Sequence, residues 1–462
     1  MVVSRVGSRN NRILGFTRSM TVAGVSTPAC RHSARRRQPA VRKNDPLFAP
    51  HGCFHRRVES VSSEARQGAP ALRCYTTRPS DSGHYRARIP VKTFHCTACQ
   101  ALVFFENTQC LSCGHALAFV NDKMTMLSLE PQQNRSWVPI ENSVTGGQAY
   151  RLCINNIEHG VCNWAIPADS PDSLCKACSL TQIIPDLSVP GNREAWLKLE
   201  TAKRRLLFDL FSLELPFEAK REPTDKGLEF RFLSDVLTVN GDRSRILTGH
   251  DNGVITINVA EANDAYREAE RLRHREPYRT LLGHFRHGIG HYYWDLLIEG
   301  ADVRQAFRQL FGDERADYQA ALKIHYEQGA PANWTDNYIS AYASTHPWED
   351  WAESWAHVLH MVDALETAHA VGLSVKPTRG DEPALAIPGR PSPARIGDFD
   401  QLVSEWNALT YVLNNLTRGL GLPDAYPFVL CAPVVEKLRF ICSTITSSRS
   451  GSQTLKPAQV AA

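Results

Sequence analysis

Apolar residues recur at three- and four-residue steps along much of this chain, which is the period of an α-helix. One such stretch starts at Asn192, a candidate cap, and ends before Pro216. Further helices are predicted over 278–297, 399–417 and 433–445. The second half of the chain is therefore expected to be mainly helical.

Two shorter runs, 228–233 and 254–259, have the composition of strands, and Asn252-Gly253 supplies a turn just before the second run. One small sheet followed by helix after helix predicts an α+β domain, which we place over 191–445. The proline-rich stretch 374–397 is expected to be a loop within this domain.

Residues 1–90 differ from the rest of the chain in charge and in pattern. They carry 17 Lys and Arg against 4 Asp and Glu, a balance of +13, so the rest of the chain must carry −9 to give the net charge of +4. No apolar period is sustained there, and we expect a disordered basic extension over 1–90 and a disordered tail over 446–462. A valine codon can start a bacterial protein, so one hypothesis is that the native protein begins at Val91.

The chain shows no sign of a membrane span or of a secretory signal. No apolar run approaches the length that crosses a bilayer, and the N-terminus lacks a compact apolar core followed by a cleavage site. An Arg- and Ser-rich start is also typical of transit peptides, which is the alternative interpretation. Because most cysteines have metal spacing, we expect a reducing compartment and a bacterial cytoplasmic protein.

Eight of the 13 cysteines fall into two groups whose spacing is typical of metal sites. In the first group, two C-x-x-C pairs are ten residues apart, so that two tight turns bring four thiolates to one ion. The second group is looser, since only its last two cysteines form such a pair. We predict two closed, structural Zn²⁺ sites in a double zinc-ribbon region over 91–190. They are formed by Cys96, Cys99, Cys110 and Cys113, and by Cys153, Cys162, Cys175 and Cys178.

The predicted helix 278–297 carries two histidines four residues apart, His287 and His291. Their imidazoles project from one face and can share a third, catalytic-type Zn²⁺. In zinc hydrolases with the H-E-x-x-H pattern, the residue after the first histidine is a glutamate that serves as general base. This chain has Gly288 there. The pattern keeps the metal ligands and lacks the group that activates water.

A second predicted helix contributes two carboxylates one turn apart, Glu349 and Glu353, among tryptophans. Gluzincin peptidases use an E-x-x-A-[D/E] arrangement for a third zinc ligand and for a carboxylate that holds the distal N–H of a ligand histidine. We assign the first role to Glu349 and the second to Glu353, the alternative being a solvated acidic face. His284 shares the face of the histidine pair and is interpreted as a supporting histidine, with a substitute ligand as the alternative.

Several segments together resemble a bacterial family of zinc-binding metallopeptidases with an N-terminal zinc-ribbon region and a gluzincin-like domain. The resemblance implies that His287, His291 and Glu349 bind zinc and that the activity is peptide-bond hydrolysis. It also implies a glutamate at the position of Gly288, where this chain departs from the pattern. The segments are 94–96, 162–164, 184–187, 202–206, 276–287, 291–295 and 346–353.

Two functions from different classes follow from these observations. The first is a zinc metallopeptidase that pairs an extended peptide with an edge strand, for which 254–259 is the candidate; its hydrolysis is expected to be weak or absent, because a general base contributes about 10²–10⁴-fold. The second is a non-catalytic pseudo-peptidase that binds a protein through its cleft and zinc ribbons. A third interpretation is a sequence error or a strain-specific lesion at Gly288.

The expected partner is a peptide or a protein rather than a nucleic acid. Between Phe94 and Cys113 the first zinc ribbon has no Lys or Arg, so it offers no cation for phosphate contacts. Substrate preference and oligomeric state are not determined by the sequence.

Overall fold

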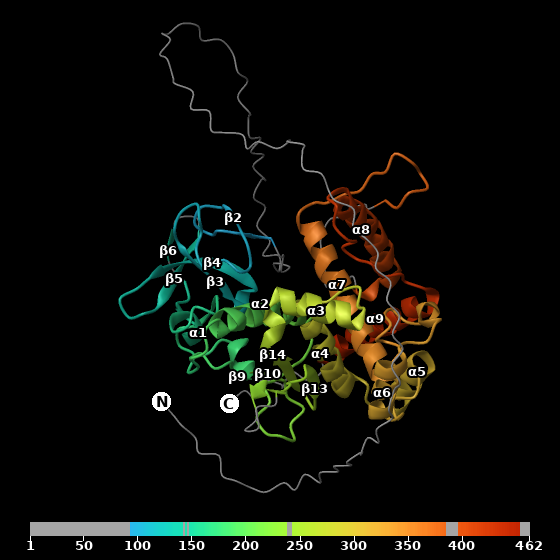
Figure 1. Ribbon diagram of the computed structural model, residues 1–462. Helices are drawn as coiled ribbons and strands as arrows, with labels where there is room; N and C mark the ends of the chain where they lie inside the picture. Colours follow the sequence, from blue (N-terminus) through green and yellow to red (C-terminus); the bar gives the residue numbers. More distant parts are fainter. Residues whose placement is uncertain (1–92, 142–143, 146, 238–242, 385–395, 453–462) are drawn as a thin grey trace, which may run out of the picture. The chain divides into compact units, whose positions relative to one another are not determined.

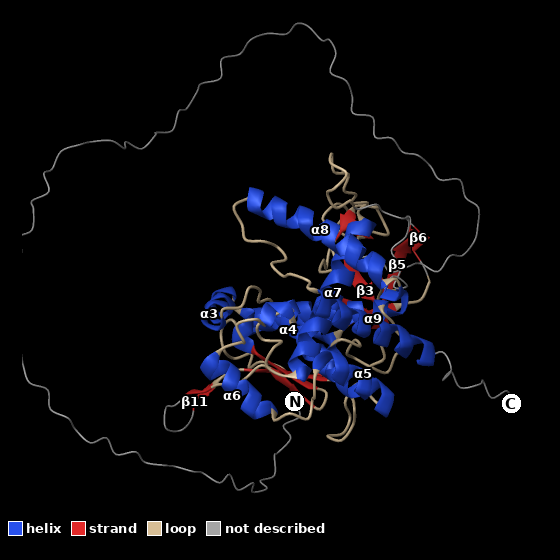
Figure 2. Cartoon of the chain, turned by 90° about the vertical axis from the view of Figure 1, so that its right-hand side faces the viewer, coloured by secondary structure: helices blue, strands red, loops and turns tan. Residues whose placement is uncertain are grey.

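The computed structural model describes residues 93–141, 144–145, 147–237, 243–384 and 396–452. The predicted disordered extension over 1–90 lies outside these residues. In the described part, small sheets near the N-terminal end are followed by a mainly helical region, which confirms the α+β class (Figure 1). Figure 2 shows the same division, with strands in red and the helices that surround them in blue.

The cysteine-rich region contains more sheet than the sequence indicated. Two short strands, β1 (Phe94–His95) and β2 (Leu102–Val103), form the antiparallel pair expected of a ribbon. A six-stranded sheet follows, in the order β4-β3-β8-β7-β5-β6. Its strands are β3 (Ala116–Val120), β4 (Thr125–Pro131), β5 (Trp137–Glu141), β6 (Val144–Thr145), β7 (Tyr150–Leu152) and β8 (Trp164–Pro167). A short helix, α1 (Ile154–Ile157), lies between the last two.

A four-stranded sheet opens the helical domain, in the order β13-β14-β10-β9. The predicted strands are present as β10 (Glu229–Leu233) and β14 (Val254–Asn258), which run parallel. The Asn252-Gly253 turn joins β14 to β13 (Gly249–Asp251), and both turn residues have positive φ, as a tight hairpin requires. β9 (Thr181–Ile183) completes the sheet from the cysteine-rich side.

The expectation that 254–259 forms an edge strand is wrong. β14 lies between β13 and β10, so both of its backbone edges are used in the sheet. The hairpin places β13 outside it, and β13 is the edge strand of this sheet. The sequence did not reveal β13 because it is three residues long and has no apolar alternation. A further two-stranded pair, β11 (Val236–Leu237) with β12 (Arg243–Ser244), lies nearby in the chain.

Among the described residues, eight longer helices follow the pattern of apolar residues. The four that were predicted with residue ranges begin within three residues of the predicted position, although the first is capped by Gly191 rather than by Asn192. The helices are α2 (Asn192–Ser212), α3 (Asp264–His274), α4 (Leu281–Leu297), α5 (Ala301–Phe311), α6 (Tyr318–Gln328), α7 (Pro347–Ala370), α8 (Phe399–Gly419) and α9 (Ala432–Ser452).

The predicted tail begins too early. α9 continues to Ser452, seven residues past the predicted helix end at 445, so 446–452 are helical rather than disordered. The Ile445 side chain is fully buried, so packing of the helix continues where the sequence becomes rich in serine. Residues 453–462 lie outside the described part of the chain.

Helices α4 and α7 pack against each other at the centre of the helical domain, and this contact positions the candidate site. Gly290 makes the close approach possible, because a Cβ at this position would lie 2.9 Å from the Cα of Ala352. The Trp351 indole donates a hydrogen bond of 2.8 Å to the Gly290 carbonyl across the same contact. The glycine therefore lets the two backbones meet at a distance that a side chain would prevent.

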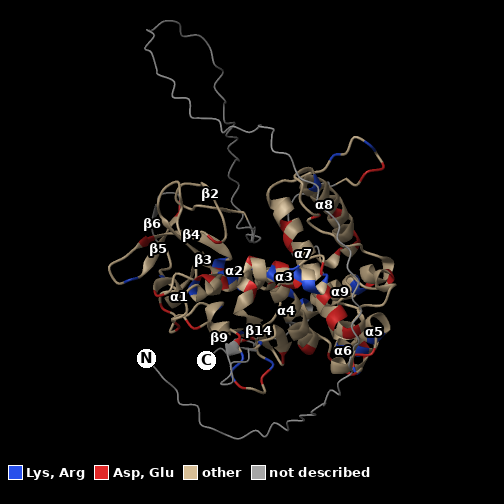
Figure 3. Ribbon diagram, viewed as in Figure 1, with Lys and Arg blue, Asp and Glu red and all other residues tan. Residues whose placement is uncertain are grey.

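Charges of both signs are interspersed along the helices, as Figure 3 shows for α3. Arg267 pairs with Asp264, and Arg271 pairs with Glu268, within this one helix. Its basic residues are thus largely balanced by neighbours, which gives no support to phosphate binding there. Among the described helices, none is both long enough and apolar enough to cross a lipid bilayer.

Candidate metal centre

Helix α4 presents two imidazoles on one face, because His287 and His291 are one turn apart. The helix starts at Thr280, whose hydroxyl accepts a hydrogen bond of 3.0 Å from the Gly283 N–H and so caps the first turn. The two Nε2 atoms lie 3.2 Å apart. The local structure thus directs two nitrogen ligands to a common point.

Helix α7 brings the third group to that point. Pro347 occupies the first turn, and the His346 side chain accepts a hydrogen bond of 3.2 Å from the Trp348 N–H, so the helix start is well defined. Glu349 follows in the first turn, where the positive end of the helix dipole favours a carboxylate. Its side chain is 1% exposed.

The three groups have the separations that a zinc ion requires. The Glu349 Oε2 atom lies 3.0 Å from Nε2 of His287 and 3.5 Å from Nε2 of His291. Two ligand atoms bound tetrahedrally to one Zn²⁺ lie about 3.4 Å apart, given bonds of about 2.1 Å. Moreover, this buried carboxylate oxygen has no well-oriented hydrogen bond. The residues present therefore fit a zinc ion.

Glu353 lies one turn further along α7 and contacts the other side of His287. Its Oε1 atom is 2.8 Å from Nδ1 of the imidazole, and its Oε2 atom accepts a hydrogen bond of 2.7 Å from the Ser340 hydroxyl. With Nδ1 bonded to the carboxylate, Nε2 keeps its lone pair for a metal ion. Two hydrogen bonds on one carboxylate also fix the orientation of the ring.

The electrostatics of the site favour a cation. Burial alone would lower the pKa of His287, but the adjacent carboxylates of Glu349 and Glu353 outweigh it and raise this pKa to about 10. Burial likewise opposes the charged form of Glu349, yet the two histidines hold its pKa well below the usual value. The same field that favours a proton on His287 favours a metal cation between these groups.

Two contacts of the site were not predicted from the sequence. The Tyr318 hydroxyl donates a hydrogen bond of 2.6 Å to Glu349 Oε1. The His250 ring, on strand β13, stacks on the His291 ring at 5.7 Å, and its Nε2 atom accepts a hydrogen bond from the Gly253 N–H. Burial lowers the pKa of His250 to about 3, so the ring is neutral. No spacing rule connects either residue to the histidine pair.

Gly288 lies on α4 between the two histidines and is buried. A Cβ at this position would lie 3.1 Å from Cγ2 of Ile255, a buried side chain on β14. Gly290, in contrast, would place a Cβ against backbone atoms of α7. The packing thus requires glycine at 290, whereas at 288 it leaves room for a side chain after a small shift.

Three other histidines of α4 and α7 have different partners. His284 Nδ1 lies 3.5 Å from Oε2 of Glu261, and this histidine is not one of the three groups that converge. His357 Nδ1 bonds the Tyr426 hydroxyl at 2.8 Å, and His360 Nδ1 accepts from Arg286 at 2.6 Å. Burial lowers the pKa of His357 to about 4, so its ring is neutral as well.

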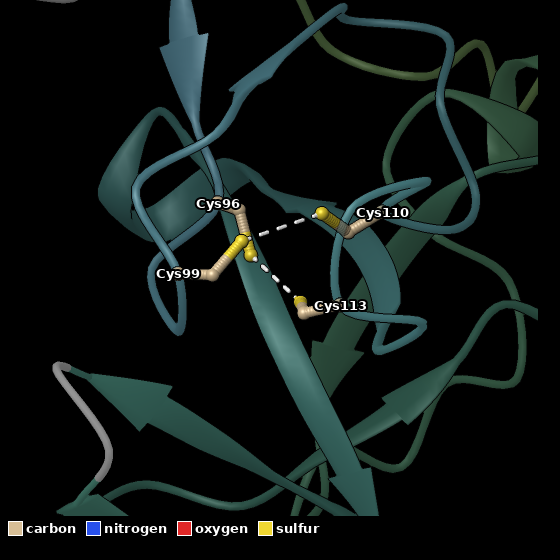
Figure 4. A group of neighbouring side chains, drawn as sticks. All are labelled: Cys96, Cys99, Cys110 and Cys113. Atoms are coloured by element: carbon tan, nitrogen blue, oxygen red, sulfur yellow. Dashed lines mark hydrogen bonds between the residues drawn. The ribbon is translucent and has the colours of Figure 1, made fainter. Parts of the chain in front are cut away.

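Both predicted cysteine groups converge. In the first, Sγ of Cys96 lies 3.5 Å from that of Cys113, and Sγ of Cys99 lies 3.7 Å from that of Cys110 (Figure 4). In the second, Sγ atoms of Cys162 and Cys175 are 3.7 Å apart. Thiolates bound tetrahedrally to one Zn²⁺ are about 3.8 Å apart, given Zn–S bonds of about 2.3 Å. All eight sulfur atoms are therefore arranged as two four-thiolate zinc sites.

Comparison with known proteins agrees with this geometry. Residues 192–444 match the family described as "Putative zinc-binding metallo-peptidase", and residues 93–189 match a zinc-ribbon domain. The first match alone covers more than half of the chain. The chain belongs to this metallopeptidase family.

Relatives of this metallopeptidase homologue occur in mycobacteria. An uncharacterized protein of Mycobacterium tuberculosis and one of Mycobacterium bovis are each 40% identical to it over 356 residues, which cover 77% of this chain and 95% of the relative. No solved structure matches the chain.

A large cavity opens over the candidate metal centre of this metallopeptidase homologue. It has a volume of about 2430 Å³ and is bordered by His287, Gly288 and His291 from α4 and by Glu349 from α7. Pockets for small molecules usually measure about 300–1,000 Å³. The cavity is therefore large enough for a segment of polypeptide. The edge strand β13 also borders it over its whole length, 249–251.

Proposed function

We propose that this protein is a zinc metallopeptidase by descent, with His287, His291 and Glu349 as ligands of a third zinc ion and with hydrolysis weakened by Gly288. One observation carries the proposal, which is the convergence of the three ligand atoms within 4.8 Å of one another. A zinc ion held there supplies Lewis-acid polarisation of a peptide carbonyl and activation of a water molecule.

The chain's own residues account for the other parts of a peptidase site. Glu353 orients His287 through Nδ1, and Ser340 holds Glu353 in place. The open edge of β13 can pair with an extended peptide, since its inner edge is already bonded to β14. This pairing would lay a substrate along the cavity beside the metal centre.

What the chain does not supply is a carboxylate at position 288. Side chains on a helix point toward its N-terminus, so a glutamate at this position would extend over the turn that contains His284. That region borders the cavity. Without such a general base, proton transfer from water loses a contribution of about 10²–10⁴-fold. We therefore propose peptide binding with slow or negligible hydrolysis.

Restoring the carboxylate tests the proposal. Gly288→Glu should produce zinc-dependent cleavage of casein that a chelator abolishes, because the nearest atoms that its Cβ would meet all belong to the Ile255 side chain, which must give by a few tenths of an ångström. Gly288→Gln is the matched control, since it has the same size and cannot accept a proton. If the Gly288→Gln variant cleaved casein as strongly as the Gly288→Glu variant, or if neither variant cleaved it, the peptidase assignment would be contradicted.

A second candidate function is that of a pseudo-peptidase that binds a protein in the cleft without cutting it. Gly288 itself favours this alternative, because the ligands are kept and the base is missing. The two functions differ in a simple measurement. A pseudo-peptidase holds an extended peptide in the presence of zinc and releases it intact, whereas a slow peptidase releases fragments on long incubation.

A further inference from the structure

The two oxygens of Glu349 have different partners, and the difference bears on how this carboxylate can bind a metal. Oε2 faces the Nε2 atoms of His287 and His291 at 3.0 Å and 3.5 Å. Oε1 points away from them and accepts the hydroxyl hydrogen of Tyr318 at 2.6 Å. Since the carboxylate is 1% exposed, water does not compete for either oxygen.

The position of Tyr318 is fixed by its surroundings. It is the first residue of α6, whose cap is Asp317, with a side-chain oxygen that accepts a hydrogen bond from the Ala320 N–H at 3.0 Å. Its ring lies edge-on to the ring of His346 at 5.2 Å and close to that of Trp348 at 5.9 Å. Tyr318 is thereby held against the first turn of α7, directly beside Glu349.

The same loop is tied to α7 at a second point. His346, the cap of α7, contacts the Ala316 carbonyl through Nε2 at 3.1 Å. This contact links the residue before the α6 cap to the cap of α7. The Tyr318 hydroxyl and the Glu349 carboxylate thus come from two helix starts that contact each other.

This arrangement limits the ways in which Glu349 can bind a metal ion. A carboxylate binds through one oxygen or through both, and a zinc site with three protein ligands has a fourth position for water or substrate. A Glu349 that used both oxygens would add a further ligand atom and crowd that position. The hydrogen bond from Tyr318 directs Oε1 away from the two histidines, so turning this oxygen toward the metal position would break that bond.

We infer that Tyr318 is a positioning residue that restricts Glu349 to one-oxygen ligation and so keeps a coordination position open at the third zinc site. The inference rests on the proposed zinc centre and adds to it a role for a residue outside both ligand helices. It also explains why a tyrosine 31 positions before Glu349 donates to the oxygen that the histidines do not face.

Tyr318→Phe in the full chain tests the inference, because it removes the hydroxyl and keeps the ring. Tyr326→Phe is the matched control: it removes a hydroxyl from the same helix, on a side chain that is 60% exposed and does not bond Glu349. Zinc is titrated against a chromophoric chelator, and the two four-cysteine sites serve as an internal reference for folding.

We expect Tyr318→Phe to bind the third zinc about 10-fold more weakly, as loss of a hydrogen bond to a metal ligand usually does. After replacement of the third zinc by Co²⁺, the visible bands of the variant should also weaken, because a second carboxylate oxygen raises the coordination number. Tyr326→Phe should match the unaltered protein in both measurements.

The possible failures are distinguishable. If the unaltered protein binds only two zinc ions, the proposed metal centre fails, and this inference fails with it. If the unaltered protein binds three and Tyr318→Phe has the same affinity and the same Co²⁺ spectrum, the centre stands and the role of Tyr318 is overturned. An equal loss of affinity for the third zinc in Tyr326→Phe would also overturn the role of Tyr318, since the effect would not depend on the hydrogen bond to Glu349.

Discussion

Glu353 bonds the Nδ1 atom of His287 at 2.8 Å, on the side of the ring opposite the point where the three ligand atoms meet. Glu349 and Glu353, one turn apart on α7, thus act on the two nitrogens of the same imidazole. One carboxylate lies beside Nε2 among the candidate ligands, and the other fixes which nitrogen carries the proton. The proposed metal centre depends on this division of roles.

Removal of the orienting carboxylate should therefore weaken metal binding without removing a ligand. We expect Glu353→Ala to reduce the affinity of the third zinc by about 10- to 100-fold. Ser340→Ala, which removes only the hydroxyl that holds Glu353, should have a smaller effect in the same direction. The check is chelator competition; an unchanged affinity in Glu353→Ala would mean that the contact does not orient His287.

The two glycines between the histidines should respond differently to alanine. Gly290→Ala brings a methyl group to 2.9 Å from the backbone of α7, and overpacking of this kind costs about 1–3 kcal/mol. Gly288→Ala meets only the Ile255 side chain, while alanine favours a helix by about 1 kcal/mol over glycine. In urea unfolding, the free energy of unfolding should fall for Gly290→Ala and should stay nearly the same or rise for Gly288→Ala. A similar loss in both would contradict the packing described for α4.

Replacement of the buried Arg286 should also destabilise the fold. Arg286, next to His287 in the chain, is 2% exposed and pairs with Asp209 on α2 and with Asp363 on α7. Arg286→Met leaves both carboxylates without this partner, which costs about 3–5 kcal/mol for a buried pair. Arg271→Met is the control, because its pair with Glu268 is on the surface, where such pairs contribute about 0–1 kcal/mol. Equal unfolding midpoints for the two variants would contradict the account.

Zinc should leave the three sites in a definite order. The third site has only three protein ligands and borders the cavity, so it should lose its ion to a chelator first. In the Cys96 group one cysteine is exposed and one half-buried, whereas all four cysteines of the Cys153 group are buried. The Cys96 group should therefore release zinc before the Cys153 group. The order can be followed by removing samples at successive times after the chelator is added and measuring their zinc content. If the Cys153 group released its zinc fastest, the expected order would be wrong.

Much of this structure could be predicted because its signals are local. The spacing of cysteines and histidines is set by turns and by the helical period, so the sequence alone singled out the groups that converge in space. Long apolar periods likewise gave α2 and α8 within a few residues. These features depend on residues close together in the chain.

Several features that depend on distant residues were not predicted. The six-stranded sheet is built from short strands between cysteines, and β3 pairs with β8 although about 45 residues separate them. Tyr318 reaches Glu349 from another helix, and no pattern of residue types announces that contact. The sequence also could not separate Gly290 from Gly288, because only the position of α7 shows which glycine the packing requires.

The content of zinc per chain tests the central claim most directly. Protein purified in excess zinc and then freed of loosely bound metal should contain three ions, and His287→Ala with His291→Ala should contain two, those of the four-cysteine sites. Two ions in the unaltered protein, with no further loss in the double variant, would contradict the proposed metal centre.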